Sequence, residues 1–321
     1  MKKILVTGCA GFIGSHLSER LLAEGYQVAG IDNFDPFYDV AIKRRNLASF
    51  LNHPNFEFIE TDLADKTGLQ RVFPTAIDLI VHLAGKAGVR PSIDDPAGYI
   101  RANILATQNL LDEMKMRQIN KLAFASSSSV YGNSKETPFT ETMDVSTPIS
   151  PYASTKKACE LINYTAHHLY GFDIINLRFF TVFGPRQRPD LAIHKFTRLI
   201  RSGKPIPMFG DGSTARDYTY IDDTLQGILG AVNFLFNHEG VYEIVNLGNN
   251  KPVLLRDMIN IIYEATGEKP NITPMPMQPG DVDITYADIS KAQRLFGYQP
   301  KFDFKEGVKL FVDWYDNVLM C

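Results

Sequence analysis

A glycine-rich turn between a short strand and a helix is the feature that most restricts the fold of this 321-residue chain. The turn follows the β-branched run 4–7 directly, and its glycines are spaced GxxGxxG. It opens a helix over residues 12–24, whose apolar residues recur four apart on one face. In this context glycines make a tight turn, let backbone amides approach a diphosphate and let the helix pack closely on the strand. The turn predicts a dinucleotide site whose contacts are Gly8, Gly11, Phe12, Ile13 and Gly14.

A carboxylate at the end of the second expected strand indicates which dinucleotide is bound. Asp32 comes eighteen residues after Gly14. There a carboxylate accepts hydrogen bonds from the adenine ribose hydroxyls and repels a 2′-phosphate, which favours NAD over NADP. Residues that follow the second, third and fourth expected strands extend this expected NAD site. They are Asn33, Asp62, Leu63, Leu83, Ala84 and Gly85.

Short β-branched runs alternate with longer helical patterns through the first 180 residues. The expected strands are 4–7, 27–31, 56–60, 79–82, 121–126 and 174–179. Such alternation implies a parallel sheet covered by helices on both faces. From about Gly184, proline, glycine and other turn residues become more frequent. We predict an α/β fold with a Rossmann-type doubly wound parallel sheet in residues 1–180, completed by segments near 215–235, and a smaller C-terminal α+β substrate lobe in 181–321.

Composition excludes several other classes of protein. Lysine and arginine number 33 against 36 acidic residues, a net charge of -3, so no nucleic-acid partner is expected. The three cysteines, Cys9, Cys159 and Cys321, form no CxxC pair, which argues against a disulfide framework and a structural metal. No apolar stretch reaches the roughly 18 residues that a membrane helix needs. We expect a cytoplasmic protein without a metal or a membrane anchor.

The pattern YxxxK can supply a tyrosine base, and it occurs twice. A tyrosine that acts as a base near neutral pH needs its pKa, about 10 when free, lowered by a nearby cation. Tyr131 and Lys135 lie in a turn-rich strand exit, whereas Tyr152 and Lys156 lie in a strongly helical segment and share a face. We therefore predict Tyr152 as the base and Lys156 as the cation that lowers its pKa, with both also touching the cofactor.

Four consecutive serines, residues 126–129, follow the fifth expected strand. A serine run at a strand exit is commonly turn chemistry. Beside a dinucleotide site and a tyrosine base, however, a hydroxyl aimed at the oxygen of a reacting carbinol completes the acid/base set. We predict Ser127 as this catalytic hydroxyl.

Together the glycine turn, Asp32, the serine run and the pair Tyr152 and Lys156 resemble the extended short-chain dehydrogenase/reductases, more narrowly the NAD-dependent nucleotide-sugar epimerases and dehydratases. The resemblance covers almost the whole chain. It implies that the tyrosinate takes the proton of the sugar C4 hydroxyl while NAD takes the C4 hydride, which then returns to the other face of the 4-keto sugar. NAD is regenerated in each cycle and stays tightly bound. Asn103 matches a residue that orients the catalytic loop and belongs to the expected cofactor set.

The C-terminal half indicates the substrate within this family. Segment 178–185 resembles the family's substrate strand, with Thr181 where UDP-glucose 4-epimerases usually carry asparagine. Thr181, the Arg-Pro-Asp at 188–190 and the loop 35–39 resemble UDP-glucuronate 4-epimerases, which implies conversion of UDP-glucuronate to UDP-galacturonate. A C6 carboxylate binds best to a guanidinium and hydroxyl donors. This role is assigned to Ser127, Ser128, Thr181 and Arg188.

The diphosphate of the UDP-sugar has its own expected contacts. Arg216, after the turn 210–213, matches the family's diphosphate arginine, and Lys195 is a second cation for the same phosphates. Many relatives also carry an arginine before Gly280, where this chain has Gln278 and Pro279, so that phosphate contact is left unassigned.

Other functions remain open from the residues alone. The first alternative is UDP-glucose 4-epimerase. A UDP-glucuronate decarboxylase follows if the carboxylate of the β-keto acid intermediate is held less firmly. A dehydratase is disfavoured because the serine run offers no acid, and a non-catalytic NAD-binding protein because both Tyr152 and Lys156 are present. Helices 99–114 and 154–170 are apolar over more than one face, and relatives pair them as a four-helix bundle, which implies a homodimer.

Overall fold

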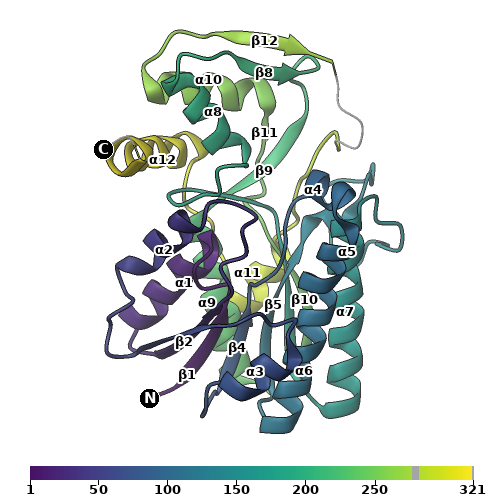
Figure 1. Cartoon of the computed structure of the whole chain (residues 1–321). Helices are drawn as coiled ribbons and strands as arrows, with labels where there is room; N and C mark the ends of the chain where they lie inside the picture. Colours follow the sequence, from purple (N-terminus) through teal and green to yellow (C-terminus); the bar gives the residue numbers. More distant parts are fainter. Residues whose placement is uncertain (277–281, 320–321) are drawn as a thin grey trace. The chain divides into compact units, whose positions relative to one another are not determined.

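The computed structural model describes residues 1–276 and 282–319. The chain forms two compact units, drawn in Figure 1. The first unit comprises Met1–Gly132, Met143–Arg178 and Gly227–Val245. The second comprises Asn133–Thr142, Phe179–Gln226 and Asn246–Cys321. Both units are therefore assembled from segments that lie far apart in the sequence.

The central sheet has seven strands in the order β10-β6-β5-β4-β1-β2-β3. Their bounds are β1 Lys3–Thr7, β2 Gln27–Asp32, β3 Phe56–Glu60, β4 Leu79–His82, β5 Lys121–Ser127, β6 Asp173–Phe179 and β10 Tyr242–Leu247. The pairs from β3 through β2, β1 and β4 to β5 are parallel. The predicted Rossmann-type sheet is confirmed, and its six predicted strands end within one residue of those observed. Register places Thr7 beside both Ile31 and His82 at the carboxyl edge.

Helices cover this sheet on both faces (Figure 1). The helices and helical turns are α1 Phe12–Ala23, α2 Val40–Ala48, α3 Lys66–Val72, α4 Val89–Asp94, α5 Pro96–Tyr99, η1 Ile100–Leu105, α6 Ala106–Arg117, η2 Ser128–Tyr131, α7 Pro151–Tyr170 and α9 Ile221–Asn237. The predicted helix 99–114 is helical throughout, but residues 100–105 form the π-helical turn η1 instead of a regular α-helix. π-turns are rare and often occur at functional sites, and this one holds the buried Asn103.

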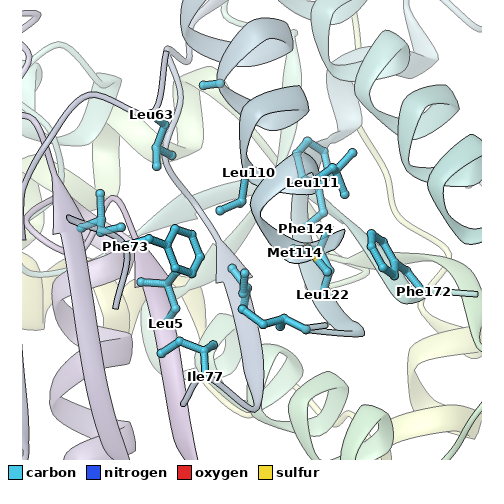
Figure 2. Packing of buried hydrophobic residues seen from close by; sticks show 14 of the residues in the cluster. Leu5, Leu63, Phe73, Ile77, Leu110, Leu111, Met114, Leu122, Phe124 and Phe172 are labelled. Carbon is cyan, nitrogen blue, oxygen red and sulfur yellow. The ribbon is translucent and has the colours of Figure 1, made fainter. Parts of the chain in front are cut away.

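One hydrophobic cluster holds α6 against the sheet. Leu110, Leu111 and Met114 of α6 are fully buried against residues of the strands, and Figure 2 shows them beside Leu122 and Phe124 of β5. Burying side chains of this size stabilises a fold by roughly 1.5 to 3 kcal/mol each. The cluster fixes the helices from which the site residues project.

The second unit is a mixture of short strands and helices. Its bounds are β7 Thr181–Phe183, α8 Ala192–Arg201, β8 Ile206–Phe209, β9 Ala215–Tyr220, β11 Pro252–Leu254, α10 Leu255–Thr266, β12 Ile272–Met275, α11 Ser290–Phe296 and α12 Phe304–Leu319. One sheet has the order β11-β9-β7 and another pairs β12 with β8. Asp217 of β9 connects separate segments of this unit. Its buried carboxylate accepts hydrogen bonds from the backbone N–H groups of Asn249, Asn250 and Ala287.

In the part of the chain that the structure describes, none of the helices has both the length and the hydropathy needed to cross a bilayer.

Candidate active site

The turn between β1 and α1 depends on its glycines. Gly8 has a φ of 73°, and a Cβ there would lie 2.9 Å from the Ala84 nitrogen. A Cβ on Gly14 would lie 2.0 Å from the Gly8 oxygen. Gly11 is the N-cap of α1 and has no side chain to occupy the first amides of the helix. The N-terminus of α1 is therefore a suitable place for a diphosphate, as predicted from the motif.

Asp32 lies at the carboxyl end of β2 and is buried. Its carboxylate accepts the N–H groups of Ala10 at 3.1 Å and Phe34 at 2.8 Å. Burial raises the pKa of Asp32, and the nearby Lys43 opposes this shift. Each oxygen retains a lone pair beyond these bonds, so the carboxylate fits two ribose hydroxyls. Asn33 beside it is exposed, and its side chain accepts the N–H of Asp35.

The segment after β3 already has internal partners. The Asp62 carboxylate accepts the N–H of Ala64 and pairs with Arg101 at 2.9 Å. Leu63 is buried in the core, and its carbonyl accepts from the Asn109 amide. These contacts fix the backbone at the predicted adenine edge.

The segment after β4 holds three of the residues predicted to bind the cofactor and lies close to Lys156, which is predicted to take part in catalysis. Leu83 and Ala84 are half-buried, and Gly85 has a φ of 154°. A Cβ on Gly85 would lie 2.7 Å from Asn103 Oδ1 and 3.6 Å from Lys156 Nζ. Glycine is needed here because a Cβ would overlap the Asn103 side chain, whereas its contact with Lys156 would be an ordinary one.

Helix α7 presents the predicted base and its cation one turn apart. Its N-cap is Ser150, whose hydroxyl accepts the N–H of Ala153. Tyr152 and Lys156 are both buried, and the Lys156 ammonium donates to the Ala125 carbonyl of β5 at 2.7 Å. Burial lowers the pKa of Lys156, while the neighbouring Cys159 and Glu160 raise it. The structure therefore brings this tyrosine and lysine together on one helix face, as predicted.

The other YxxxK pair does not form. Tyr131 ends the short 3₁₀ turn η2, and Gly132 follows with a φ of 57°. Lys135 forms an ion pair with Asp283 instead. The prediction that these two residues share no helix face is confirmed.

Ser127 ends β5 and caps η2. Its oxygen accepts the N–H of Ser129 at 3.1 Å, and its hydroxyl donates to the Ser129 hydroxyl oxygen at 3.0 Å. Ser127 is buried, and Ser128 is half-buried. The serine run therefore has the turn chemistry expected of it, and Ser127 Oγ is held in a fixed direction.

Asn103 links the cofactor segment to α7. Its side-chain oxygen accepts the Lys86 N–H at 2.8 Å, and its nitrogen donates to the Lys86 carbonyl and to Thr155 Oγ1. Thr155 in turn donates to the Tyr152 carbonyl at 2.8 Å. The buried amide thus connects the backbone after Gly85 with the first turn of α7.

His82 is a buried residue of this region that the sequence argument missed. Thr107 donates its hydroxyl proton to the Asn103 carbonyl at 2.6 Å, so it accepts from His82 Nε2 at 3.1 Å. Nδ1 must then accept from Thr7, whose oxygen lies 2.7 Å away and itself accepts the Ala84 N–H. Burial lowers the pKa of His82 to about 3, and Lys156 adds to this shift. The only sequence signal for His82 is a polar residue at the end of an apolar strand.

In the second unit, Thr181 is half-buried on β7. Arg188 donates from Nε and Nη2 to both carboxylate oxygens of Asp190, at 3.0 and 2.7 Å. The arginine that we predicted to bind the substrate carboxylate is therefore paired with Asp190 of its own chain, a partner that was not predicted. Such a two-bond geometry fixes the plane of the guanidinium.

The predicted phosphate residues are partly exposed. Arg216 lies on β9 and donates to the Ala215 carbonyl at 2.8 Å, and Lys195 lies half-buried on α8. Gln278 lies outside the described residues. Among the residues described, no group of three or more His, Cys, Asp or Glu is arranged to hold a metal ion.

Comparison with known proteins identifies the family. The family model described as GDP-mannose 4,6 dehydratase matches residues 5–311. The chain belongs to this family of extended short-chain dehydrogenase/reductases. A UDP-glucuronate 4-epimerase of Thermodesulfobacterium geofontis is 44% identical over 97% of this chain and 95% of its own length. The predicted family resemblance is confirmed.

Solved structures of family members have the same fold. A UDP-glucuronic acid 4-epimerase of Bacillus cereus, in complex with UDP-glucuronic acid and NAD, is 36% identical with a TM-score of 0.90, covering 98% of this chain and 99% of its own. A UDP-glucose 4-epimerase of Thermotoga maritima, solved with UDP-glucose, is 31% identical with a TM-score of 0.89 over 99% of both chains. The fold alone therefore leaves both substrates possible.

Proposed function

We propose that this chain is an NAD-dependent UDP-glucuronate 4-epimerase that interconverts UDP-glucuronate and UDP-galacturonate through a 4-keto intermediate. The observation that carries the proposal is the 44% identity to a UDP-glucuronate 4-epimerase over almost the full length of both chains. The higher identity to UDP-glucuronate epimerases than to the UDP-glucose 4-epimerase with a solved structure favours the acidic substrate.

The residues of the first unit fit NAD. The glycine turn keeps the amides of α1 clear for the diphosphate, and Asp32 has acceptor capacity for ribose hydroxyls. We assign the nicotinamide half to residues 83–85 and its ribose to Lys156. When bound, NAD would accept a hydride from the sugar and give it back. The fit is supported by Gly85, where a Cβ would lie only 2.7 Å from Asn103 Oδ1, so that the segment next to the proposed nicotinamide carries no side chain at this position.

Tyr152 takes the proton of the C4 hydroxyl in this proposal and returns it to the C4 oxygen after the sugar has turned over. The buried Lys156 ammonium, held by the Ala125 carbonyl, favours the tyrosinate through its charge. The Ser127 hydroxyl, which donates to Ser129 Oγ in the structure, exchanges this bond for one to the same C4 oxygen when the sugar binds. The reacting oxygen is thereby held between a base and a hydroxyl donor, the arrangement that general acid–base catalysis requires.

A carboxylate-binding set decides between epimerisation and decarboxylation. The 4-keto intermediate of a glucuronate is a β-keto acid, which loses carbon dioxide when the bond to its carboxylate aligns with the carbonyl π system. We assign Arg188 and Thr181, with the hydroxyls of Ser127 and Ser128, to keep this bond out of alignment. If Arg188→Ala or Thr181→Ala changes neither turnover nor the yield of a UDP-pentose, this assignment is wrong.

Arg216 and Lys195 are assigned to the UDP diphosphate. The Arg216 guanidinium donates to the Ala215 carbonyl, which helps to fix its direction, and a guanidinium matches the geometry of phosphate oxygens. Substitution of either residue should raise the KM for every UDP-sugar alike.

The proposed function is tested by NMR of the purified protein with UDP-glucuronate and, separately, with UDP-glucose, with and without added NAD. The C4 proton changes its couplings when it moves between axial and equatorial positions. We expect a galacturonate signal to appear from the acid and little change in the neutral sugar. If only UDP-glucose turned over, the proposed substrate would be wrong, but the proposed epimerisation at C4 would stand. If neither sugar turned over, the proposal would be refuted.

A second copy of the chain is the partner we propose. Apolar side chains of η1 and α7 are exposed, with Ile100 at 53%, Leu105 at 44% and Leu161 at 57%. Exposed apolar residues grouped on helices favour an interface with another protein surface. We propose that η1, α6 and α7 pair with the same helices of the second copy as a four-helix bundle.

A further inference from the structure

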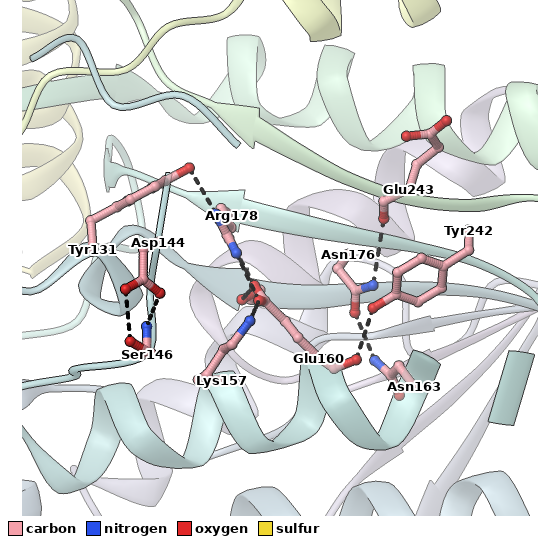
Figure 3. A network of polar contacts seen from close by, with 11 residues as sticks. Tyr131, Asp144, Ser146, Lys157, Glu160, Asn163, Asn176, Arg178, Tyr242 and Glu243 are labelled. Atoms are coloured by element: carbon pink, nitrogen blue, oxygen red, sulfur yellow. Dashed lines mark hydrogen bonds and ion pairs between the residues drawn. The ribbon is translucent and has the colours of Figure 1, made fainter. Parts of the chain in front are cut away.

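A buried ion pair contacts residues 126–131, which we call the serine loop. Arg178 of β6 donates from Nε and Nη2 to the two carboxylate oxygens of Glu160 of α7, both at 2.8 Å (Figure 3). Each side chain is 1% exposed. Neither residue belongs to the set assigned to catalysis or to binding. A charged pair taken so completely out of water needs further polar contacts to be stable.

Those further contacts go to both ends of the loop. The Ser126 hydroxyl donates to Glu160 Oε1 at 2.6 Å, and Arg178 Nη1 donates to the Tyr131 hydroxyl at 3.0 Å. Ser126 immediately precedes Ser127, and Tyr131 ends the turn that Ser127 caps. The ion pair therefore holds residues 126–131 at their first and last positions.

The same pair is fixed relative to the base. Glu160 follows Lys156 by four residues and Tyr152 by eight, so the three side chains lie on one face of α7. Burial alone would raise the pKa of Glu160, but the hydrogen bonds from Arg178 and Ser126 outweigh it and lower that pKa. The carboxylate remains charged at neutral pH and keeps all three bonds.

We propose that Glu160 and Arg178 are positioning residues, which fix the Ser127 hydroxyl relative to Tyr152 and Lys156 by holding both ends of the serine loop. The effect of this ion pair on the reaction rate rests on the proposed function. Its ordering of the serine loop does not. Because a misplacement of about 1 Å in an active site reduces the rate by up to about 100-fold, loosening the loop should lower kcat.

The test removes single hydroxyl groups, since removing Glu160 itself would leave a buried charge and unfold the protein. Ser126→Ala and Tyr131→Phe each delete one bond between the ion pair and the loop. Tyr242→Phe is the matched control, because Tyr242 donates to the Glu160 backbone carbonyl at 2.8 Å and has no part in the loop. For each variant we would measure kcat, KM, thermal stability and the hydrogen exchange of the amides of residues 127–131.

We expect Ser126→Ala and Tyr131→Phe to lower kcat about tenfold with an unchanged KM for UDP-glucuronate, and to speed exchange of the Ser129 amide. Tyr242→Phe should lose similar thermal stability and keep both kcat and loop exchange. Equal losses of kcat in all three variants, or unchanged exchange in the first two, would overturn the inference. A wild-type protein without turnover refutes the proposed function instead, and the exchange result still decides whether the ion pair orders the loop.

Discussion

Replacing His82 should remove a measurable part of the protein's sensitivity to acid. The ring accepts a hydrogen bond from Thr7 and donates one to Thr107, so it must stay neutral to keep both bonds. Burial lowers its pKa from 6.5 to about 3. A histidine whose pKa is lowered by folding binds more protons when unfolded, so it destabilises the protein as the pH falls below about 6.5.

The size of the effect follows from this shift. Each pH unit between the two pKa values changes the free energy of unfolding by about 1.4 kcal/mol. Between pH 8 and pH 5 the wild type should therefore lose about 2 kcal/mol through His82 alone. His82→Gln has no titrating group and should lose none of it. At pH 8 the variant should be less stable by about 1 to 3 kcal/mol, because glutamine does not reproduce both hydrogen bonds.

The assay is urea unfolding of wild type and variant at pH 8 and pH 5. We expect the stability difference between them to shrink by about 2 kcal/mol at pH 5, since all other titrating groups cancel in the comparison. His168→Gln, which removes an exposed histidine of α7, is the control for the substitution itself. Histidine NMR gives an independent reading, in which the signal missing from His82→Gln should not shift between pH 8 and pH 5. A ring that titrates near pH 6.5 would refute the argument.

Three further changes test other parts of the site. Tyr152→Phe should lower kcat by about 10² to 10⁴-fold while NAD and UDP-glucuronate still bind in calorimetry, because only the proton acceptor is removed; retained turnover would mean another base. Gly14→Ala places a Cβ 2.0 Å from the Gly8 oxygen and should weaken NAD binding at least about tenfold. Wild-type affinity in the same titration would show that the diphosphate binds elsewhere. Leu161→Glu should convert a dimer into a monomer in light scattering, and a wild-type protein that is already monomeric contradicts the proposed partner.

The parts of this protein that could be predicted from its sequence are those set by local spacing. The six strands were predicted from apolar runs, and the glycine turn was predicted because a tight turn leaves few alternatives. Tyr152 and Lys156 were placed together because four residues make about one helical turn. Each of these inferences depends on residues near one another in the chain.

Contacts between distant residues could not be predicted in the same way. Thr7 and His82 are 75 positions apart, and Ser126 and Glu160 are 34 apart. The π-turn that brings Asn103 inward leaves no periodic mark in the sequence, so a straight helix was predicted. A single sequence shows which residues are polar, but their partners become evident only after the sheet has brought its strands together.

Three distant contacts made by α7 lie on one face of that helix, which explains how the site keeps its geometry. Tyr152, Thr155, Lys156 and Glu160 lie on the buried side of α7. Thr155 is joined to η1, Lys156 to β5 and Glu160 to β6. At 1.5 Å per residue, the span from Tyr152 to Glu160 is about 12 Å. Every attachment between the ends of this span resists rotation and sliding of the helix. The distance of the proposed base from the serine loop is therefore determined by helix pitch and three buried anchors, so removing a single hydroxyl that supports an anchor, as in Ser126→Ala, should reduce the rate without unfolding the helix.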